Sequence, residues 1–260
     1  SFSKSVAAKK PNIIFIQADD LGYGDLSCYG QQNFKTPNID KLAAEGTRFT
    51  QYYSGSTVCA PSRSALMTGQ HTGHTRIRGN ARYPLQTEDV TVAEVLKSAG
   101  YRTGLVGKWG LGEADTVGIP TRQGFDYFFG YLNQRHAHNY YPSFLWRNEE
   151  RVKLRNIVPN EDEEGSGISS NRLDYAPDLF TAEALKFIEQ NSKDSFFLYL
   201  SYISPHANNE AKAKGMEVPT LAEFAAKNWP EPEKGKAAMI TRMDGDIGRL
   251  MALLKQLAQA

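Results

Sequence analysis

Three short apolar segments, at residues 12–17, 102–106 and 195–202, most strongly limit what this chain can fold into. Residues 12–17 read Asn-Ile-Ile-Phe-Ile-Gln, and residues 195–202 read Ser-Phe-Phe-Leu-Tyr-Leu-Ser-Tyr. Runs of this kind are typical of strands that are buried on both faces, as in a parallel sheet with helices on either side. The chain therefore predicts an α/β fold with a mostly parallel or mixed central sheet, flanked by helices on both faces.

Helical segments alternate with these strands. The segment Thr36–Gly46 starts with Thr-Pro and ends with Gly, so Thr36 is the expected cap of a helix. The segment Thr91–Gly100 opens with a capping box, Thr followed three residues later by Glu. Apolar residues at helical spacing predict two more helices, over residues 182–190 and 237–259.

Charged or ionisable side chains follow each of the three strands. Asp19 and Asp20 follow the first, Lys108 the second and His206 the third. Open α/β sheets bind ligands at the carboxyl ends of their strands. Two adjacent carboxylates favour a Ca²⁺ or Mg²⁺ ion, and a lysine can hold an oxyanion. A polar turn, a solvent-facing lysine and a core histidine are the alternatives.

The segment Ser56–Gly69 contains Cys59, one of only two cysteines in the chain. Pro61 and Gly69 predict a short helix with Cys59 at its N-terminus. The free N–H groups and the helix dipole favour an anion there, and Arg63 lies one turn further along. A cysteine in such a field is expected to be reactive; a small buried cysteine beside a surface arginine is the alternative.

These motifs resemble those of the sulfatase family. The pattern Cys-x-Pro-Ser-Arg-x-x-x-x-Thr-Gly at residues 59–69 looks like the family signature. The Asp-Asp-Leu-Gly-Tyr-Gly-Asp sequence at 19–25, the Gly-Lys-Trp-x-Leu-Gly sequence at 107–112 and the Pro-His at 205–206 are similar to further motifs. The resemblance implies an alkaline phosphatase-like fold and hydrolysis of a sulfate ester to an alcohol or phenol plus sulfate.

The resemblance also implies a modified nucleophile and a metal. In sulfatases, a maturation enzyme oxidises the signature cysteine to formylglycine, so Cys59 is the expected site of this modification. The hydrated aldehyde then attacks sulfur. Asp19, Asp20 and the modified Cys59 are the implied ligands of a divalent cation, Ca²⁺ with Mg²⁺ as the alternative.

The remaining implied residues handle the substrate. By resemblance, Arg63 stabilises charge on the transferred group, Lys108 contacts the sulfate oxygens, and His206 contacts the sulfate and assists the leaving oxygen. Gly110 departs from the commonest family pattern, which has a histidine at this position. His136 or His138 could take the place of that histidine if the segment is extended, and we favour His138, which would also accept a proton. Two loop histidines without a role are the alternative.

The composition of the chain does not favour nucleic-acid binding, membrane association or a disulfide-rich fold. The chain has 260 residues and a formal net charge of +1, with acidic and basic residues well mixed. This balance does not indicate a nucleic acid or a membrane surface as partner. The two cysteines do not make a disulfide framework. No apolar run reaches the roughly 18 residues needed for a membrane span, and a removed leader with a periplasmic or secreted location is inferred from the resemblance.

We expect residues 1–260 to be the N-terminal part of one catalytic domain. The helix at 237–259 is not followed by a strand, and the Asp-Asn pair and the second substrate-binding lysine that sulfatases carry further along are absent. Two other functions stay open: a phosphodiesterase or phosphonate monoester hydrolase of the same superfamily, and a truncated, non-catalytic chain that binds anions. The expected substrate is a small-molecule or saccharide sulfate ester that the sequence does not name.

Three further segments carry weaker predictions. The aromatic residues 49–53 predict a strand before Cys59. The polar segment 149–170 is predicted to be a disordered surface excursion that shapes the substrate rim, with a short hairpin at 151–154. His71 and His74 have the spacing of a metal pair, but no third ligand is nearby, so we interpret them as loop residues.

Overall fold

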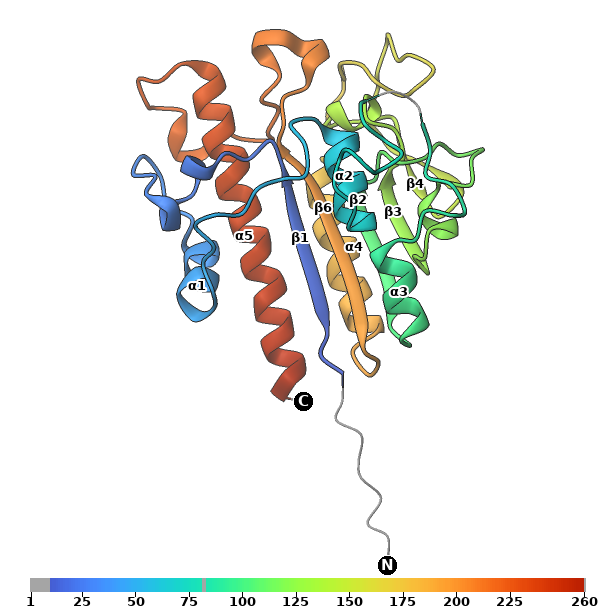
Figure 1. The fold of residues 1–260 in the computed structure, drawn as a ribbon. Helices are drawn as coiled ribbons and strands as arrows, with labels where there is room; N and C mark the ends of the chain where they lie inside the picture. Colours follow the sequence, from blue (N-terminus) through green and yellow to red (C-terminus); the bar gives the residue numbers. More distant parts are fainter. Residues whose placement is uncertain (1–9, 81–82, 260) are drawn as a thin grey trace, which may run out of the picture.

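The computed structural model describes residues 10–80 and 83–259, which form a six-stranded sheet with helices on both faces (Figure 1). The strands are β1 (Ile13–Asp19), β2 (Arg102–Lys108), β3 (Tyr127–Tyr131), β4 (Phe144–Arg147), β5 (Glu150–Lys153) and β6 (Phe196–Pro205). The α-helices are α1 (Pro37–Glu45), α2 (Cys59–Thr68), α3 (Val92–Ser98), α4 (Ala176–Gln190) and α5 (Glu231–Gln259).

The sheet is mixed, and its order is β1-β6-β2-β3-β4-β5. The first four strands in this order are parallel, and β4 and β5 add an antiparallel hairpin at one edge. The predicted α/β fold is therefore confirmed. Parallel pairing brings the carboxyl ends of β1, β6 and β2 to one edge of the sheet, at the top of Figure 1.

Both faces of the central strand β6 are buried, as the unbroken apolar run predicts. Phe196, Leu198 and Leu200 face one hydrophobic core, which α4 and α5 cover. Phe197 and Tyr199 face the other, to which α2 and α3 contribute. The period of two along a strand thus divides β6 between two cores, and both cores stabilise the position of its carboxyl end.

The helix boundaries differ from the predicted ones at two N-termini. Helix α4 begins at Ala176 instead of 182, and α5 begins at Glu231 instead of 237. In both helices a proline, Pro177 or Pro232, stands as the second residue. Proline fits the first turn of a helix, because the N–H groups there have no intrahelical acceptor. The predicted starts were therefore too late.

Two local predictions are wrong in detail. Residues 49–53 do not form a strand, and Tyr52 and Tyr53 are exposed. Thr36 precedes α1 as predicted, but its side chain does not cap the helix and instead bonds Asp40 and Ser27. By contrast, the predicted capping box of α3 is present.

The expected hairpin is present as β4 and β5, slightly earlier than predicted. The segment after it is bonded to the rest of the chain, because the side-chain amide of Asn156 donates to the carbonyls of Pro142 and Asp174. The predicted surface excursion is therefore a folded loop.

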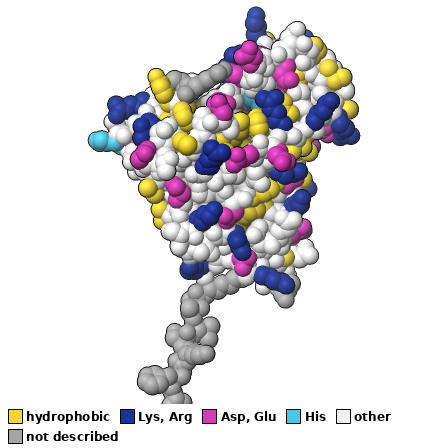
Figure 2. All heavy atoms as spheres, turned by 90° about the vertical axis from the view of Figure 1, so that its right-hand side faces the viewer, with side chains coloured by type: hydrophobic (Ala, Val, Ile, Leu, Met, Phe, Trp, Pro, Cys, Tyr) yellow, Lys and Arg dark blue, Asp and Glu magenta, His cyan; other side chains and the backbone are white. Residues whose placement is uncertain are grey.

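Basic and acidic side chains are interspersed over the face shown in Figure 2. Within residues 10–80 and 83–259, no helix combines the length and apolarity that crossing a membrane requires.

Candidate active site

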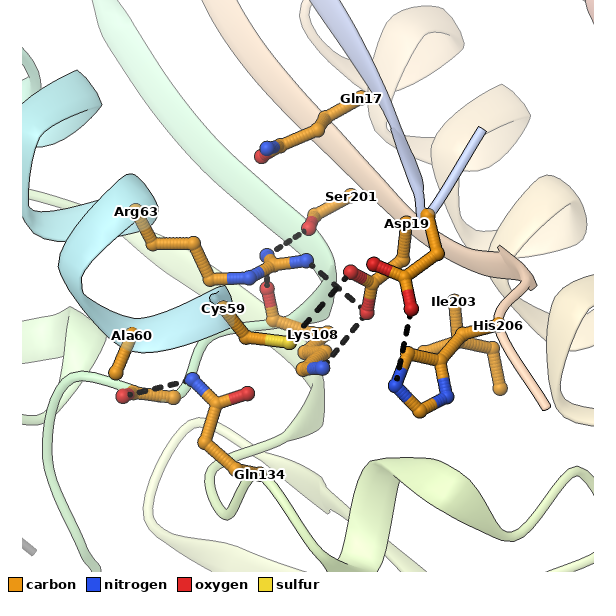
Figure 3. Close-up of polar contacts among 12 residues, drawn as sticks. Gln17, Asp19, Cys59, Ala60, Arg63, Lys108, Gln134, Ser201, Ile203 and His206 are labelled. Carbon is orange, nitrogen blue, oxygen red and sulfur yellow. Dashed lines mark hydrogen bonds and ion pairs between the residues drawn. The ribbon is translucent and has the colours of Figure 1, made fainter. Parts of the chain in front are cut away.

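Three strand ends bring their charged side chains into one cluster. Asp19 is the last residue of β1 and is paired in register with Pro205 of β6, so His206 follows immediately beside it. The ammonium of Lys108, at the end of β2, lies 2.7 Å from Oδ2 of Asp19. Nε2 of His206 lies 3.5 Å from Oδ2 of Asp20 (Figure 3). The sheet topology thus assembles residues that are far apart in the sequence.

Helix α2 places Cys59 and Arg63 against this cluster. Cys59 is the first residue of α2, as predicted, and its Sγ lies 3.8 Å from Oδ1 of Asp19. Arg63 is 1% exposed, so its side chain reaches into the sheet and not back to the solvent at the helix mouth. Its guanidinium donates to Oγ of Ser201 at 2.6 Å and to the carbonyl of Lys108 at 2.7 Å.

Ser201 and Tyr199 were not among the predicted site residues. Both lie on β6 and face Arg63, whose guanidinium is 3.3 Å from the Tyr199 hydroxyl. The available signal was Ser201, one of two serines in a mostly apolar buried strand. These contacts fix Arg63 between α2 and the sheet.

The buried charges of the cluster do not balance. Lys108 and Arg63 both pair with the carboxylate of Asp19, and all three side chains are buried. Burial by itself raises the pKa of Asp19, but the charges of Lys108 and Arg63 lower it to about 2. Two cations and one anion leave a positive excess. The site is therefore suited to an anionic ligand.

Cys59 lies within this positive field. Burial raises the pKa of its thiol, but a hydrogen bond with His206 and the charge of Lys108 outweigh burial and lower the pKa below its ordinary value. Burial also lowers the pKa of His206, and its bond with Cys59 outweighs that effect, so the net shift is upward. Both shifts are in the direction that makes a cysteine more reactive, and both arise from the contact between Cys59 and His206.

His138 lies at this site and His136 does not. Residues 136–138 form a short 3₁₀ turn, so the two side chains do not point the same way, as an extended segment would require. The ring of His138 stacks on that of His206 at 4.9 Å between centroids, and its Nδ1 is 3.2 Å from Oε2 of Glu210. His136 is fully buried between the rings of Tyr131 and Phe144.

The environments of these two histidines differ in their electrostatics. Burial and the neighbouring His206 lower the pKa of His138, although Glu210 partly opposes them. Burial lowers the pKa of His136 to about 3. At neutral pH both rings are uncharged, but only His138 is next to other ionisable groups of the site.

Gly110 has a positive φ of 79°, a backbone conformation that glycine adopts most easily. A Cβ at this position would lie 1.9 Å from Nε2 of Gln134, whose amide fills the space beside the glycine. That nitrogen donates to the carbonyl of Gly110 at 3.1 Å. Nothing in the sequence pointed to Gln134.

Asp19 and Asp20 provide suitable metal ligands, but they do not form a complete metal site with other described residues. Their carboxylates are the hard oxygen donors that Ca²⁺ and Mg²⁺ prefer. However, in the described part of the chain no three His, Cys, Asp or Glu side chains are grouped so that they could hold a metal ion. Asp19 is instead paired with Lys108 and Arg63, while Asp20 points its largely exposed carboxylate towards His206. His71 and His74 likewise have no third ligand in those residues.

Fold and site together define an α/β protein with buried cationic side chains at the carboxyl ends of parallel strands and a cysteine at the N-terminus of a neighbouring helix. A family model for sulfatases, described as Sulfatase, matches residues 11–260. The chain belongs to the sulfatase family.

Individual relatives agree with this assignment. An arylsulfatase of Hemicentrotus pulcherrimus is 35% identical over 217 residues, which cover 76% of this chain and 38% of the relative. An N-acetylgalactosamine-6-O-sulfatase of Bacteroides thetaiotaomicron is 35% identical over 301 residues, covering 96% of this chain and 56% of the relative. The crystal structure of Ps i-CgsB in complex with k-i-k-neocarrahexaose has a TM-score of 0.78 and 28% identity, covering 96% of this chain and 56% of that one. The chain thus spans between 38% and 56% of the length of these relatives.

Proposed function

We propose that the protein hydrolyses a sulfate ester to an alcohol or phenol plus sulfate. The observation that carries this proposal is the position of Cys59, at the first turn of α2 and within a cluster of Lys108, Arg63 and His206. An anion bound at this point would meet a nucleophile, two fixed cations and a proton donor together. The family of the chain supports the same reaction.

The proposal includes oxidation of Cys59 to formylglycine by a maturation enzyme, and a Ca²⁺ ion with Asp19 and Asp20 among its ligands. The hydrated aldehyde would supply the oxygen nucleophile, and a bound cation would polarise a sulfate oxygen. The lowered pKa of the Cys59 thiol supports the first part, because the thiolate is the form that is readily oxidised. The two hard oxygen donors at the end of β1 support the second.

Lys108 and Arg63 stabilise negative charge on the transferred group in different ways. Lys108 has three N–H donors and uses one on Asp19, so it retains donors for a sulfate oxygen. Arg63 is fully buried and bonded to Ser201 and to the Lys108 carbonyl. It therefore fixes the direction of Lys108 and adds positive charge behind the transferred group.

The stacked histidines supply an acid and a base. His206 lies 3.5 Å from Asp20 and also contacts Cys59, which raises the pKa of its ring, so we assign it as the donor to the leaving oxygen. The pKa of His138 is lowered, so its ring is neutral and can accept a proton. Glu210 accepts from Nδ1 of His138 and thereby leaves Nε2 as the basic atom.

The substrate class also forms part of the proposal. The names of two relatives specify an aryl sulfate or an N-acetylgalactosamine 6-sulfate, and Ps i-CgsB was solved with a neocarrahexaose. We therefore propose that this protein acts on a small-molecule or saccharide sulfate ester. A periplasmic or secreted location completes the proposal, and fractionation of the native host tests it.

The test combines mass spectrometry with turnover assays on protein purified from its native host. The tryptic peptide of residues 49–63 should carry an aldehyde in place of the Cys59 thiol. The protein should then hydrolyse an aryl sulfate faster than a phosphodiester or a phosphonate monoester. Faster phosphodiester turnover would favour the alternative hydrolase. An unmodified thiol without sulfate turnover would favour the binding-only alternative.

A further inference from the structure

One buried amide oxygen near Cys59 has no hydrogen-bond donor. Oε1 of Gln134 is inaccessible to solvent, and no donor among the described residues reaches it. Leaving such an atom unsatisfied costs free energy, so each case in a native protein needs an explanation. A ligand or a modified side chain that brings a donor to this oxygen would supply one.

The orientation of the Gln134 amide is fixed from its other end. Nε2 donates to the carbonyl of Gly110 at 3.1 Å, whereas a flipped amide would place two oxygens against each other. Oε1 must therefore face away from Gly110. Figure 3 shows this oxygen on the side of Cys59 and Lys108.

The Gln134 amide borders a cavity that shares one lining residue with the N-terminus of α2. Gln134 and Gly110 line a cavity of about 130 Å³, and Asn80 lines the same cavity. The side-chain oxygen of Asn80 accepts from the backbone N–H of Ala60 at 2.9 Å, directly after Cys59. Asn80 thus connects the cavity beside Gln134 to the first turn of α2.

We infer that Gln134 is a positioning residue for the side chain at position 59. Its Oε1 accepts a hydrogen bond from a hydroxyl on that side chain, and so holds the other hydroxyl in line for attack. This role rests on the proposed function, because a thiol offers only a weak donor, whereas the hydrated aldehyde offers two hydroxyls. An amide accepts a hydrogen bond without taking the proton, so Gln134 orients the nucleophile and leaves proton transfer to the histidines.

Gly110 and Gln134 form one unit in this inference. Because a Cβ at 110 would overlap the Gln134 amide, the two positions cannot both carry a side chain in this volume. The Gln134 amide fits here only because position 110 is a glycine. The histidine that sulfatases commonly carry at this position would occupy the same volume from the other side.

The first test replaces Gln134 with leucine, in protein from the native host in which mass spectrometry has confirmed the aldehyde. In Gln134→Leu, kcat on an aryl sulfate should fall about 10- to 100-fold while KM changes less than about threefold. Labelling of the substrate-free aldehyde by an aminooxy probe should become at least about threefold faster, because the hydrate loses an acceptor and more free aldehyde is present.

Gln123 offers a matched control. It is buried, its Nε2 donates to the carbonyl of Val117, and its Oε1 also lacks a donor among the described residues. Gln123→Leu should leave both the labelling rate and kcat within about twofold of the wild type. If Gln134→Leu matches Gln123→Leu in both measurements, the inference is overturned while the proposed function stands. A wild-type protein without the aldehyde would overturn both.

A second pair of variants keeps the inference testable if Gln134→Leu does not fold. Gly110→His alone should lower Tm by about 5 °C or more, because the new side chain collides with the amide. The double variant Gly110→His/Gln134→Gly should recover part of the lost Tm, because the clash is removed while the positive φ at position 110 remains unfavourable, and it should recover at least about a tenth of the wild-type kcat. The double variant would contradict a shared role for the two positions if it folds but behaves like Gln134→Leu. In that case its kcat would be as low, and its labelling by the aminooxy probe as fast, as in Gln134→Leu.

Discussion

The strand ends and the loop at residues 132–139 contribute to the same site, but they are held in different ways. Lys108 and His206 stand at the ends of strands that are buried on both faces, whereas Asp19 ends β1, which is only partly buried and is held by its parallel pairing with β6. Gln134 and His138 lie on a loop, and each is held by one or two side-chain contacts. The buried charges thus belong to the rigid scaffold, and the groups we assign to orientation and proton acceptance belong to the loop.

The two ways of holding these residues predict which substitutions reduce activity most. A strand-end residue has no nearby replacement, because the sheet determines which side chain enters the site. A side chain on a loop can fill a volume that a side chain from another part of the chain would otherwise fill. The amide of Gln134, for example, fills the space that a side chain at position 110 would occupy. We therefore expect substitutions at the strand ends to reduce activity more than substitutions in the loop.

The largest effect is expected for Lys108→Met. Loss of the buried ammonium removes a charge that we propose stabilises the transferred group, so kcat/KM on an aryl sulfate should fall about 10³-fold, or about 4 kcal/mol. Lys97→Met is the matched control, because Lys97 pairs with Asp126 at the surface. Its activity should stay within about twofold. Similar losses in both variants would show that the strand end has no special role.

The next effect is expected for His206→Gln. If the protonated ring serves the leaving oxygen, kcat should fall about 100-fold for a sugar sulfate, whose alcohol is a poor leaving group. The loss should be clearly smaller for 4-nitrophenyl sulfate, whose leaving group needs little protonation. The measurement is therefore the ratio of the two losses. Equal losses on both substrates would contradict an acid role for His206.

The strand ends could be predicted from the sequence for a physical reason. An unbroken apolar run predicts a strand buried on both faces, and parallel strands place their carboxyl ends at one edge of the sheet. The burial prediction is confirmed for β6 and is wrong for β1, which is only partly buried among the described residues. Once residues 12–17 and 195–202 are recognised as parallel strands, Asp19 and His206 are expected at the same edge of the sheet, but the pairing of the two strands is not predicted. The structure pairs Asp19 with Pro205, one residue before His206.

The loop could not be predicted in the same way. The expectation of an extended segment failed because the side-chain oxygen of Asn133 accepts from the backbone N–H groups of Arg135 and His136. Such a local bond turns the chain and directs His136 and His138 to different sides. The position of Gln134 depends on a contact with Gly110, which is 24 residues away in the sequence and has no side chain to signal it.

His138→Gln should have a smaller effect than either strand-end variant. Removal of the neutral base should lower kcat about 10-fold, or about 1.4 kcal/mol, because another group or water can accept the proton less efficiently. His136→Phe is the matched control, since that ring already lies between Tyr131 and Phe144. Its kcat should be unchanged. The reverse order of effects would exchange the roles that we assign to the two histidines.

The smallest effect concerns stability and involves His136 alone. Its pKa is about 3 in the folded protein, against an ordinary value of 6.5. As pH falls below 6.5, the unfolded chain binds a proton that the folded protein cannot accept, so stability decreases until pH reaches about 3. Between pH 7 and 5.5, the wild type should lose about 1 kcal/mol more than His136→Phe, measured by urea unfolding at each pH. Parallel pH profiles of the two proteins would mean that His136 can take up its proton in the folded state, and that the loop at this point is more open to water than the site residues it supports.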